Sequence, residues 1–273
     1  MKSFPTIISK LSEPLLITPT KHAALWRVVE AHLSGSIPVR IQDDEDGGGS
    51  DDGGDYRQIG DKAIIPVHGV IGRHLEKMAS ASPGCDLDLL DAMIDTAEYD
   101  KSVKTVIYDF RTPGGDANGV PETAAKILRS SKDTVGFFDQ ECCSGGAWLA
   151  AQCQRLYGTG SGRFGSIGAY CVILDRSRAI QNEGINVQAI SAGKFKLMGA
   201  PWKPLTEEEK QIIQTHINKL DARFHVAMNA VRACSDENMG TGLCFDGEEA
   251  AARGLIDGVA DDLDEVLEFL SEE

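Results

Sequence analysis

The sequence KTVIYDFRTPGGD, residues 104–116, contains a buried-strand pattern that ends in a glycine turn. The apolar run 104–110 predicts a strand covered on both faces, and Pro-Gly-Gly stops it. The next residues, 117–130 (ANGVPETAAKILRS), predict a helix. A buried strand, a turn and a helix in this order indicate one unit of an α/β fold.

The same alternation continues on both sides of this unit. Strand patterns occur at 63–71 (AIIPVHGVI), 134–139 (TVGFFD), 155–158 (RLYG), 169–174 (AYCVIL) and 186–190 (NVQAI). Helix patterns occur at 86–99, 144–153, 206–233 and 247–257. Ile213, Ile217, Leu220, Phe224 and Val231 give the long helix one apolar face. We therefore predict an α/β domain with a mostly parallel sheet, flanking helices and a long helix near the C-terminus.

The chain divides into three parts. Residues 1–41 predict an N-terminal helical arm, with a helix start at Thr18-Pro19-Thr20 and a stop at Gly35. Residues 42–60 predict an acidic, Gly-rich linker, and residues 61–273 the main domain. A calcium loop beginning at Asp44 is the alternative, but Asp55 would then stand where such a loop needs Glu. The linker is favoured.

The charge of the chain is concentrated in two segments. The 273 residues carry 42 acidic and 27 basic side chains, a net charge of −15. Seven acids lie in 43–55 and eight in 257–273, without a base in either, so the remainder is neutral. This distribution argues against nucleic-acid binding and against docking on anionic lipid.

The cysteine pattern is that of reduced thiols. The seven cysteines are odd in number, two are adjacent, and none forms a CxxC pair. This argues against a disulfide framework or a zinc site. We also find no signal peptide and no apolar stretch of about 18 residues, so we expect a cytoplasmic protein without a membrane span.

Two glycine turns carry the chemistry that we expect. Both Thr112–Asp116 and Cys142–Gly146 follow a buried strand and lead into a helix. Such turns on adjacent parallel strands converge at one sheet edge, where helix N-termini present free backbone N–H groups. Ser144 could attack a carbonyl there while N–H groups of Gly115 and Gly145 hold the oxyanion. The alternative is two ordinary turns, with Asp116 as an N-cap.

A base for Ser144 is not evident among the histidines. The surroundings of Ser144 also fail the GxSxG pattern, because position 142 is Cys. Lys194 and Lys196, in SAGKFKLMGAP (191–201), are the remaining candidates. A lysine acts as a base when burial lowers its pKa from about 10.4 to about 7–8. The SxxK string at 191–194 follows a strand and contains Gly, so we discount it.

The chain resembles the signal peptide peptidase A family of serine proteases, which has the Clp-protease/crotonase-like fold. The matching blocks run from about 62 to 268: IIPVHGVI, VIYDFRTPGGD, CCSGGAWLAA, FGSIGAY, GINVQAISAGKFK, the long helix and FDGEEAAARGLIDGV. The resemblance implies a Ser–Lys dyad with Ser144 as nucleophile and Lys196 as base. It also implies that Ser166 orients Lys196 and that Gly115 and Gly145 form the oxyanion hole.

The positions at which the chain departs from the family pattern indicate which branch of the family it resembles. Phe195 stands where the family usually has Tyr, and Thr112 where Ser is more usual. We see neither a membrane anchor nor a C-terminal scaffold extension. The first 40 residues resemble the tailed-phage branch, whose members are head maturation (prohead) proteases. Cys142 and Cys143 beside the nucleophile are unusual; they either pack or make the site sensitive to oxidation.

The resemblance therefore implies a Ser–Lys endopeptidase of phage or prophage origin. It would cleave scaffold, portal or coat proteins in the host cytoplasm or the prohead, as a homo-oligomeric ring, without a metal or nucleotide cofactor. The alternatives are a cytosolic signal-peptide or peptide-degrading enzyme and a non-catalytic capsid assembly protein. A crotonase-like acyl-CoA enzyme is a further alternative, which would bind CoA and would not need Lys196.

Overall fold

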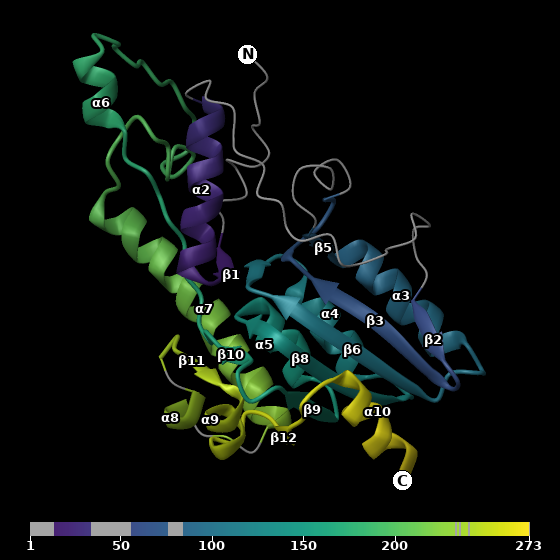
Figure 1. Cartoon of the computed structure of the whole chain (residues 1–273). Coiled ribbons are helices and arrows are strands. Elements are labelled where there is room, and N and C mark those ends of the chain that lie inside the picture. The colour runs from purple at the N-terminus through teal and green to yellow at the C-terminus, as the bar shows by residue number, and fades with distance from the viewer. Residues whose placement is uncertain are drawn as a thin grey trace.

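The computed structural model of the chain describes residues 14–33, 56–75, 84–232, 234, 236–239 and 241–272. Within them, strands and helices alternate as the sequence predicts, and the strands form two sheets (Figure 1). The α/β prediction, with a mostly parallel sheet, flanking helices and a long helix near the C-terminus, is confirmed.

The larger sheet has eight strands and supplies the frame of the molecule. Among the strands of the described residues, only β2 and β11 pair antiparallel, and all other pairs in this sheet are parallel. Its members are β2 (Arg57–Ile59), β3 (Lys62–His68), β6 (Thr105–Thr112), β8 (Asp133–Cys143), β9 (Arg155–Gly158), β10 (Arg163–Gly165), β11 (Cys244–Asp246) and β12 (Gly258–Val259). The carboxyl ends of β6 and β8 therefore lie side by side.

The smaller sheet has four strands in the order β1–β7–β4–β5. It covers the carboxyl ends of the larger sheet, because β4 follows β3 and β7 follows β6 along the chain. Its members are β1 (Leu15–Ile17), β4 (Val70–Gly72), β5 (Gly84–Asp86) and β7 (Gly114–Asp116). β1 comes from the predicted N-terminal arm and was not expected as a strand.

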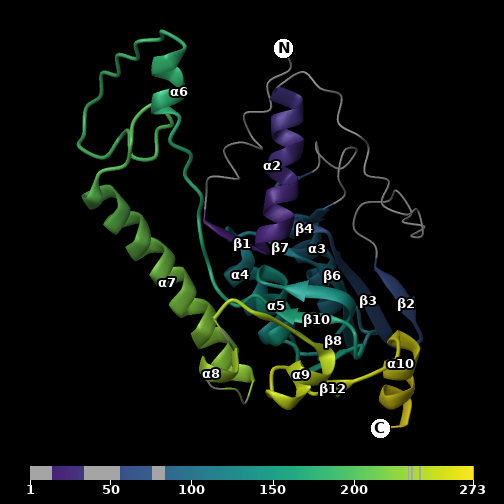
Figure 2. The same ribbon diagram turned by 60° about the vertical axis from the view of Figure 1, so that its left-hand side comes forward.

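Helices cover both faces of the larger sheet (Figures 1 and 2). One face packs against α3 (Leu87–Tyr99), α4 (Val120–Leu128) and α5 (Gly145–Ala151), and the other against α10 (Leu263–Glu272). The remaining helices are α2 (Pro19–Leu33), α6 (Ser177–Asn182), α7 (Glu207–Val231), α8 (Asp236–Met239) and α9 (Gly247–Ala252). α2 confirms the predicted helix of the arm.

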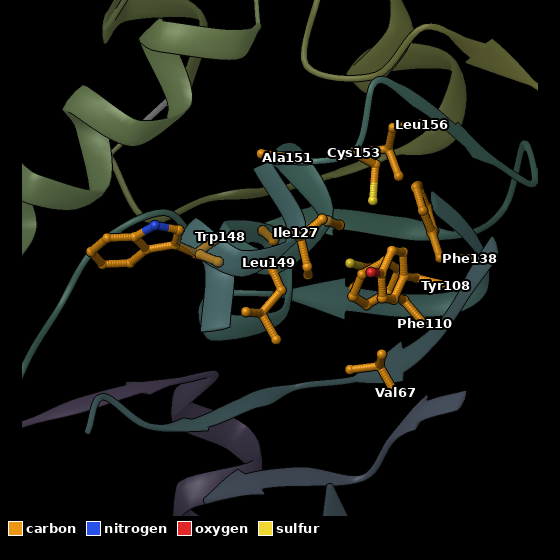
Figure 3. Packing of buried hydrophobic residues seen from close by; sticks show 14 of the residues in the cluster. Val67, Tyr108, Phe110, Ile127, Phe138, Trp148, Leu149, Ala151, Cys153 and Leu156 are labelled. Atoms are coloured by element: carbon orange, nitrogen blue, oxygen red, sulfur yellow. The ribbon is translucent and has the colours of Figure 1, made fainter. Parts of the chain in front are cut away.

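The main core lies between the larger sheet and α3, α4 and α5. Tyr108, Phe110 and Phe138 cluster on the sheet, while Trp148 points away from them towards α7 (Figure 3). A smaller cluster on the opposite face includes Ile107, and α10 covers it. Burial on both faces explains why the strands appear in the sequence as continuous apolar runs.

Two predicted strands are wrong. Residues 169–174 and 186–190 form no strand; Tyr170 makes a single bridge to Leu15. Apart from residues 169 and 170, both segments belong to 171–205, which leaves the sheets, and Ile190 in it is fully exposed. Their apolar residues thus satisfied a strand pattern without a neighbouring strand. Of the predicted linker, residues 56–60 are described and 57–59 form β2, whereas 42–55, with the calcium-loop alternative, lie outside the described residues.

Candidate active site

Ser144 lies at the junction of β8 and α5, in an unusual backbone conformation. Its φ is 54° and its ψ is −115°, a region that costs a non-glycine residue about 1–3 kcal/mol. Its N–H donates to the carbonyl of Gly165 (2.8 Å), and its carbonyl accepts from the Trp148 N–H (3.0 Å). Ser144 is 1% exposed, and its side chain does not cap α5. The turn thus holds a buried serine hydroxyl that the helix does not use.

The Pro-Gly-Gly turn packs directly against this junction. Gly114 has a φ of +92°, and a β-carbon there would overlap the carbonyl oxygen of Leu16 and lie 2.9 Å from the amide nitrogen of Gly145. The Gly114 N–H donates to Thr112 Oγ1 (3.1 Å), and that hydroxyl donates to the Gly69 carbonyl (2.6 Å). The predicted convergence of the two glycine turns is confirmed.

Gly115 is enclosed by backbone on both sides. β7 pairs with β4 through Gly115 and Ile71, and with β1 through Gly115 and Leu16. A β-carbon at position 115 would overlap the backbone of Ile71. Only glycine fits at position 115. Its N–H can point only across the strands, in the direction of the hydrogen bonds of the sheet.

Ser166 lies beside the same junction. It follows β10, whose Gly165 pairs with Cys143 at the end of β8. Its φ is 53°, it is buried, and its N–H donates to the Leu243 carbonyl (2.6 Å). Two buried serines with left-handed backbones therefore end two neighbouring strands. Together with Gly115 and Gly145, they are the predicted site residues that the structure brings together.

Lys196 lies elsewhere in the same chain. It is exposed and belongs to the segment between α6 and α7, in which Lys194 pairs with Glu208 (2.6 Å). Glu208 is near the start of α7, whereas α5 packs against α7 at Phe224, about 24 Å further along the helix. Both views place the segment beside the N-terminal part of α7, away from α5 (Figures 1 and 2).

A pair of thiols adjoins the candidate nucleophile, a feature that the sequence did not indicate. Cys143 and Cys244 pair with Gly165 from opposite sides, and their sulfur atoms are 3.6 Å apart. The hydrogen bond from the Cys143 thiol, together with Arg163, lowers the pKa of Cys244 to about 7. The same hydrogen bond and burial raise the pKa of Cys143 well above its usual range. Burial does the same for Cys142, whose thiol only packs.

The part of the chain that the structure describes contains no cluster of His, Cys, Asp and Glu side chains suited to a metal ion. In the same residues, no helix has both the length and the apolar character that crossing a bilayer requires.

A buried serine at a strand–helix junction, flanked by a second glycine turn, is an arrangement suited to acyl transfer. Comparison with known sequences gives the class of protein. Residues 126–273, more than half of the chain, match the model of peptidase family S49, and the chain belongs to that family.

Individual relatives come from phages and from cells. The chain is 28% identical to the head-tail preconnector protein GP5 of Enterobacteria phage P21, over 92% of this chain and 54% of that protein. It is 24% identical to capsid assembly protease C of Escherichia phage lambda, over 97% and 65% respectively. A Methanocaldococcus jannaschii protein with a provisional protease name is 30% identical, over 63% and 57%. The chain thus spans a little over half to about two thirds of these relatives.

Among solved structures, a mutant of ClpP1 from Listeria monocytogenes is similar at a TM-score of 0.47 and 10% identity. The match covers 74% of this chain and 94% of that one.

Proposed function

We propose that the chain is a serine endopeptidase with Ser144 as its nucleophile. The observation that carries the proposal is the junction of β8 and α5, where a buried serine in one glycine turn holds a φ of 54° beside the other glycine turn. A strained backbone persists where the surrounding structure fixes it, and such positions cluster at active sites. Membership of a peptidase family adds the reaction class.

The N–H groups of Gly115 and Gly145 are proposed to stabilise the oxyanion. The close packing of Gly114 on the amide of Gly145 supports this role, because it places both turns around one point. Gly145 is also the first residue of α5, so the positive end of the helix dipole faces that point. Donors fixed in advance stabilise the developing negative charge without reorganisation.

Lys196 is proposed as the base, supplied by a neighbouring copy of the chain. Within one chain, the segment that carries Lys196 lies along the N-terminal part of α7, far from Ser144. That segment exposes Ile185, Val187 and Ile190 to solvent, as a surface covered in an assembly would do. The neighbour's Lys196 would then meet Ser144, and Ser166 would orient its amine.

The reaction follows from these roles. Ser144 Oγ attacks the peptide carbonyl carbon and gives its proton to the Lys196 amine. The oxyanion collapses, the C–N bond breaks, and the lysine returns the proton to the leaving amine. Water then attacks the acyl ester, the lysine takes a proton from it, and Ser144 recovers its hydroxyl as the ester C–O bond breaks.

The substrates are proposed to be phage head proteins, such as scaffold, portal or coat proteins. The two phage relatives match 92% and 97% of this chain, whereas the M. jannaschii relative matches 63%. The lambda match leaves only about 3% of this chain uncovered, so it includes β1 and α2 of the N-terminal arm. The site of action would be the host cytoplasm or the prohead.

The test is subunit mixing. Ser144→Ala and Lys196→Ala variants are each incubated with an unfolded protein, and cleavage is followed by intact mass. Each variant alone should be inactive, and an equimolar mixture should recover activity, because a mixed pair contains one complete site. Lys194→Ala is the matched control and should keep full activity.

Inactivity of every form, including the unmodified chain, would favour the non-catalytic assembly role. Full activity of Lys196→Ala would remove this lysine from the mechanism. Cleavage of short peptides but not of head proteins would favour a peptide-degrading enzyme.

A further inference from the structure

β1 is held by backbone hydrogen bonds along both of its edges. On one edge it pairs antiparallel with β7, with Leu16 opposite Gly115. On the other edge, the Leu15 N–H donates to the Tyr170 carbonyl (2.8 Å), and the Tyr170 N–H donates to the Leu15 carbonyl (3.2 Å). Leu15, Leu16 and Ile17 are all buried. Three residues of the N-terminal arm thus fill a slot between β7 and Tyr170.

The register places one carbonyl of β1 at the proposed oxyanion site. At the two ends of this ladder, the Thr18 N–H donates to the Pro113 carbonyl and the Ala117 N–H donates to the Pro14 carbonyl. In an antiparallel ladder every second pair of opposite residues is hydrogen-bonded. Leu16 and Gly115 lie two residues from each of these pairs, so they form a hydrogen-bonded pair as well. The N–H of Gly115 therefore faces the Leu16 carbonyl.

Gly145, which carries the second proposed donor, lies close to the same oxygen atom. A β-carbon at Gly145 would lie 3.3 Å from the Leu16 oxygen, and one at Gly114 would overlap it. The Leu16 carbonyl thus sits between the two glycine turns, beside Ser144. A substrate carbonyl about to be attacked needs this position.

A peptide substrate would reach this position by adding a strand to β7. Strand addition to a sheet edge is a common way for proteins to bind extended peptides. β1 is the outermost member of its sheet, so without it β7 would present a free edge. The gap from β7 to Tyr170 would then have the width of one strand, about 4.8 Å from each neighbour.

We propose that Leu15–Ile17 occupies the substrate position of the peptide-binding cleft, which therefore takes extended peptides with three successive apolar residues and opens only when β1 leaves. The inference rests on the proposed function, since it assigns the substrate class of that same site. The bond between Leu16 and Ile17 corresponds to the bond that is cut.

The first test measures peptide binding in the full-length Ser144→Ala chain, so that it does not depend on proteolysis. The probe is a fluorescein-labelled peptide of residues 12–20, SEPLLITPT, followed by fluorescence anisotropy. A Leu16→Asp substitution places a charge in a buried position and should release β1, so affinity should rise at least tenfold. Leu89→Asp, at an exposed leucine of α3, is the matched control and should leave affinity unchanged.

The second test holds β1 in place, in case Leu16→Asp disrupts the fold. Leu15 and Tyr170 are a directly bonded antiparallel pair, with Cα atoms about 5.5 Å apart, a separation that suits a disulfide. In a Leu15→Cys/Tyr170→Cys variant, an oxidant such as oxidised glutathione should join the two cysteines, seen as the loss of two hydrogens. Peptide binding and proteolysis should then fall at least tenfold and return with reductant. The reduced form of the same variant is the control.

The outcomes separate this inference from the proposed function. Equal peptide affinity in the folded Leu16→Asp and Leu89→Asp chains, or full binding by the oxidised disulfide variant, would overturn the inference even if the protein is an active protease. The expected binding changes, together with no proteolysis by the chain that retains Ser144, would support β1 as the occupant of the cleft and would overturn the peptidase assignment.

Discussion

The indole ring of Trp148 stacks on the ring of Phe224, with centroids 4.6 Å apart and planes 13° from parallel. Trp148 belongs to α5, one turn after Ser144, and Phe224 belongs to the C-terminal half of α7. The stack therefore connects the helix that begins at the candidate nucleophile with the long helix that leads to the Lys196 segment. Both side chains are buried.

Replacing Trp148 by Ala should lower the free energy of unfolding by about 3–5 kcal/mol, because a large cavity remains between α5 and α7. Urea denaturation measures the change. Val226→Ala, two residues beyond Phe224 but 69% exposed, should change it by no more than about 0.5 kcal/mol. Similar losses in both variants would show that the stack does not join the two helices.

Gly114→Ala should reduce proteolysis about 100-fold or more, an effect as large as the loss of one oxyanion donor, because it would block access to both donors. The added methyl group would enter the position of the carbonyl oxygen between the two turns. Gly184→Ala is the control that separates crowding from backbone strain. Gly184 has a similarly left-handed φ of +74°, but no atom of the described residues lies close to the position of the added methyl group. That control should keep its activity. Normal activity of Gly114→Ala would remove the turn from the oxyanion site.

Cys244 should react with iodoacetamide faster than any other described cysteine near neutral pH. The hydrogen bond from Cys143 and the charge of Arg163 lower its pKa to about 7. Its thiolate, and hence the alkylation rate, should rise through about pH 7 and level off above pH 8. Burial raises the pKa of Cys171, so its rate should still be rising there.

Peptide mass mapping after timed alkylation at several pH values gives both rates. Arg163→Gln should move the Cys244 profile to higher pH. A Cys244 profile centred above pH 8 in the unmodified chain would contradict the predicted environment of this thiol.

Arg232→Met should cost about 2–4 kcal/mol of stability. The Arg232 guanidinium is buried and donates to the carbonyls of Ala151 (3.1 Å) and Cys153, and to Asp257 (2.5 Å). The carboxylate of Asp257 is 44% exposed, so water can stabilise it after the change, and most of the cost falls on the carbonyls. Arg253→Met, whose ion pair is more exposed, should change thermal unfolding much less.

The sequence predicted the elements of the central sheet because β3, β6 and β8 are buried on both faces, which requires continuous apolar runs. The glycine turns were also evident in the sequence. Tight packing leaves room for nothing larger at Gly114 and Gly115, so the sequence has to carry glycine there. The convergence of Ser144 with these turns followed from the parallel order of the strands. Ser166 was identified through family resemblance alone, because a turn hydroxyl has no distinguishing local pattern.

Other features depend on contacts that local sequence does not encode. β1 contains three apolar residues between Pro14 and Thr18, too few to show a period. The segment 186–190 has apolar residues in a strand-like pattern, but they face solvent within one chain. A local pattern does not distinguish side chains meant for the chain's own core from those meant for a second molecule. The approach of Cys143 to Cys244 across Gly165 likewise needs the three-strand register.

The outward position of residues 171–205 has a consequence for when the protein would work. If each Ser144 depends on a lysine from another copy, a dilute solution of newly made chains contains only half-sites, and the rate falls more steeply than the protein concentration. Confinement in a small volume would raise the local concentration and start cleavage without any chemical signal. The timing of proteolysis would then be set by crowding of the chains.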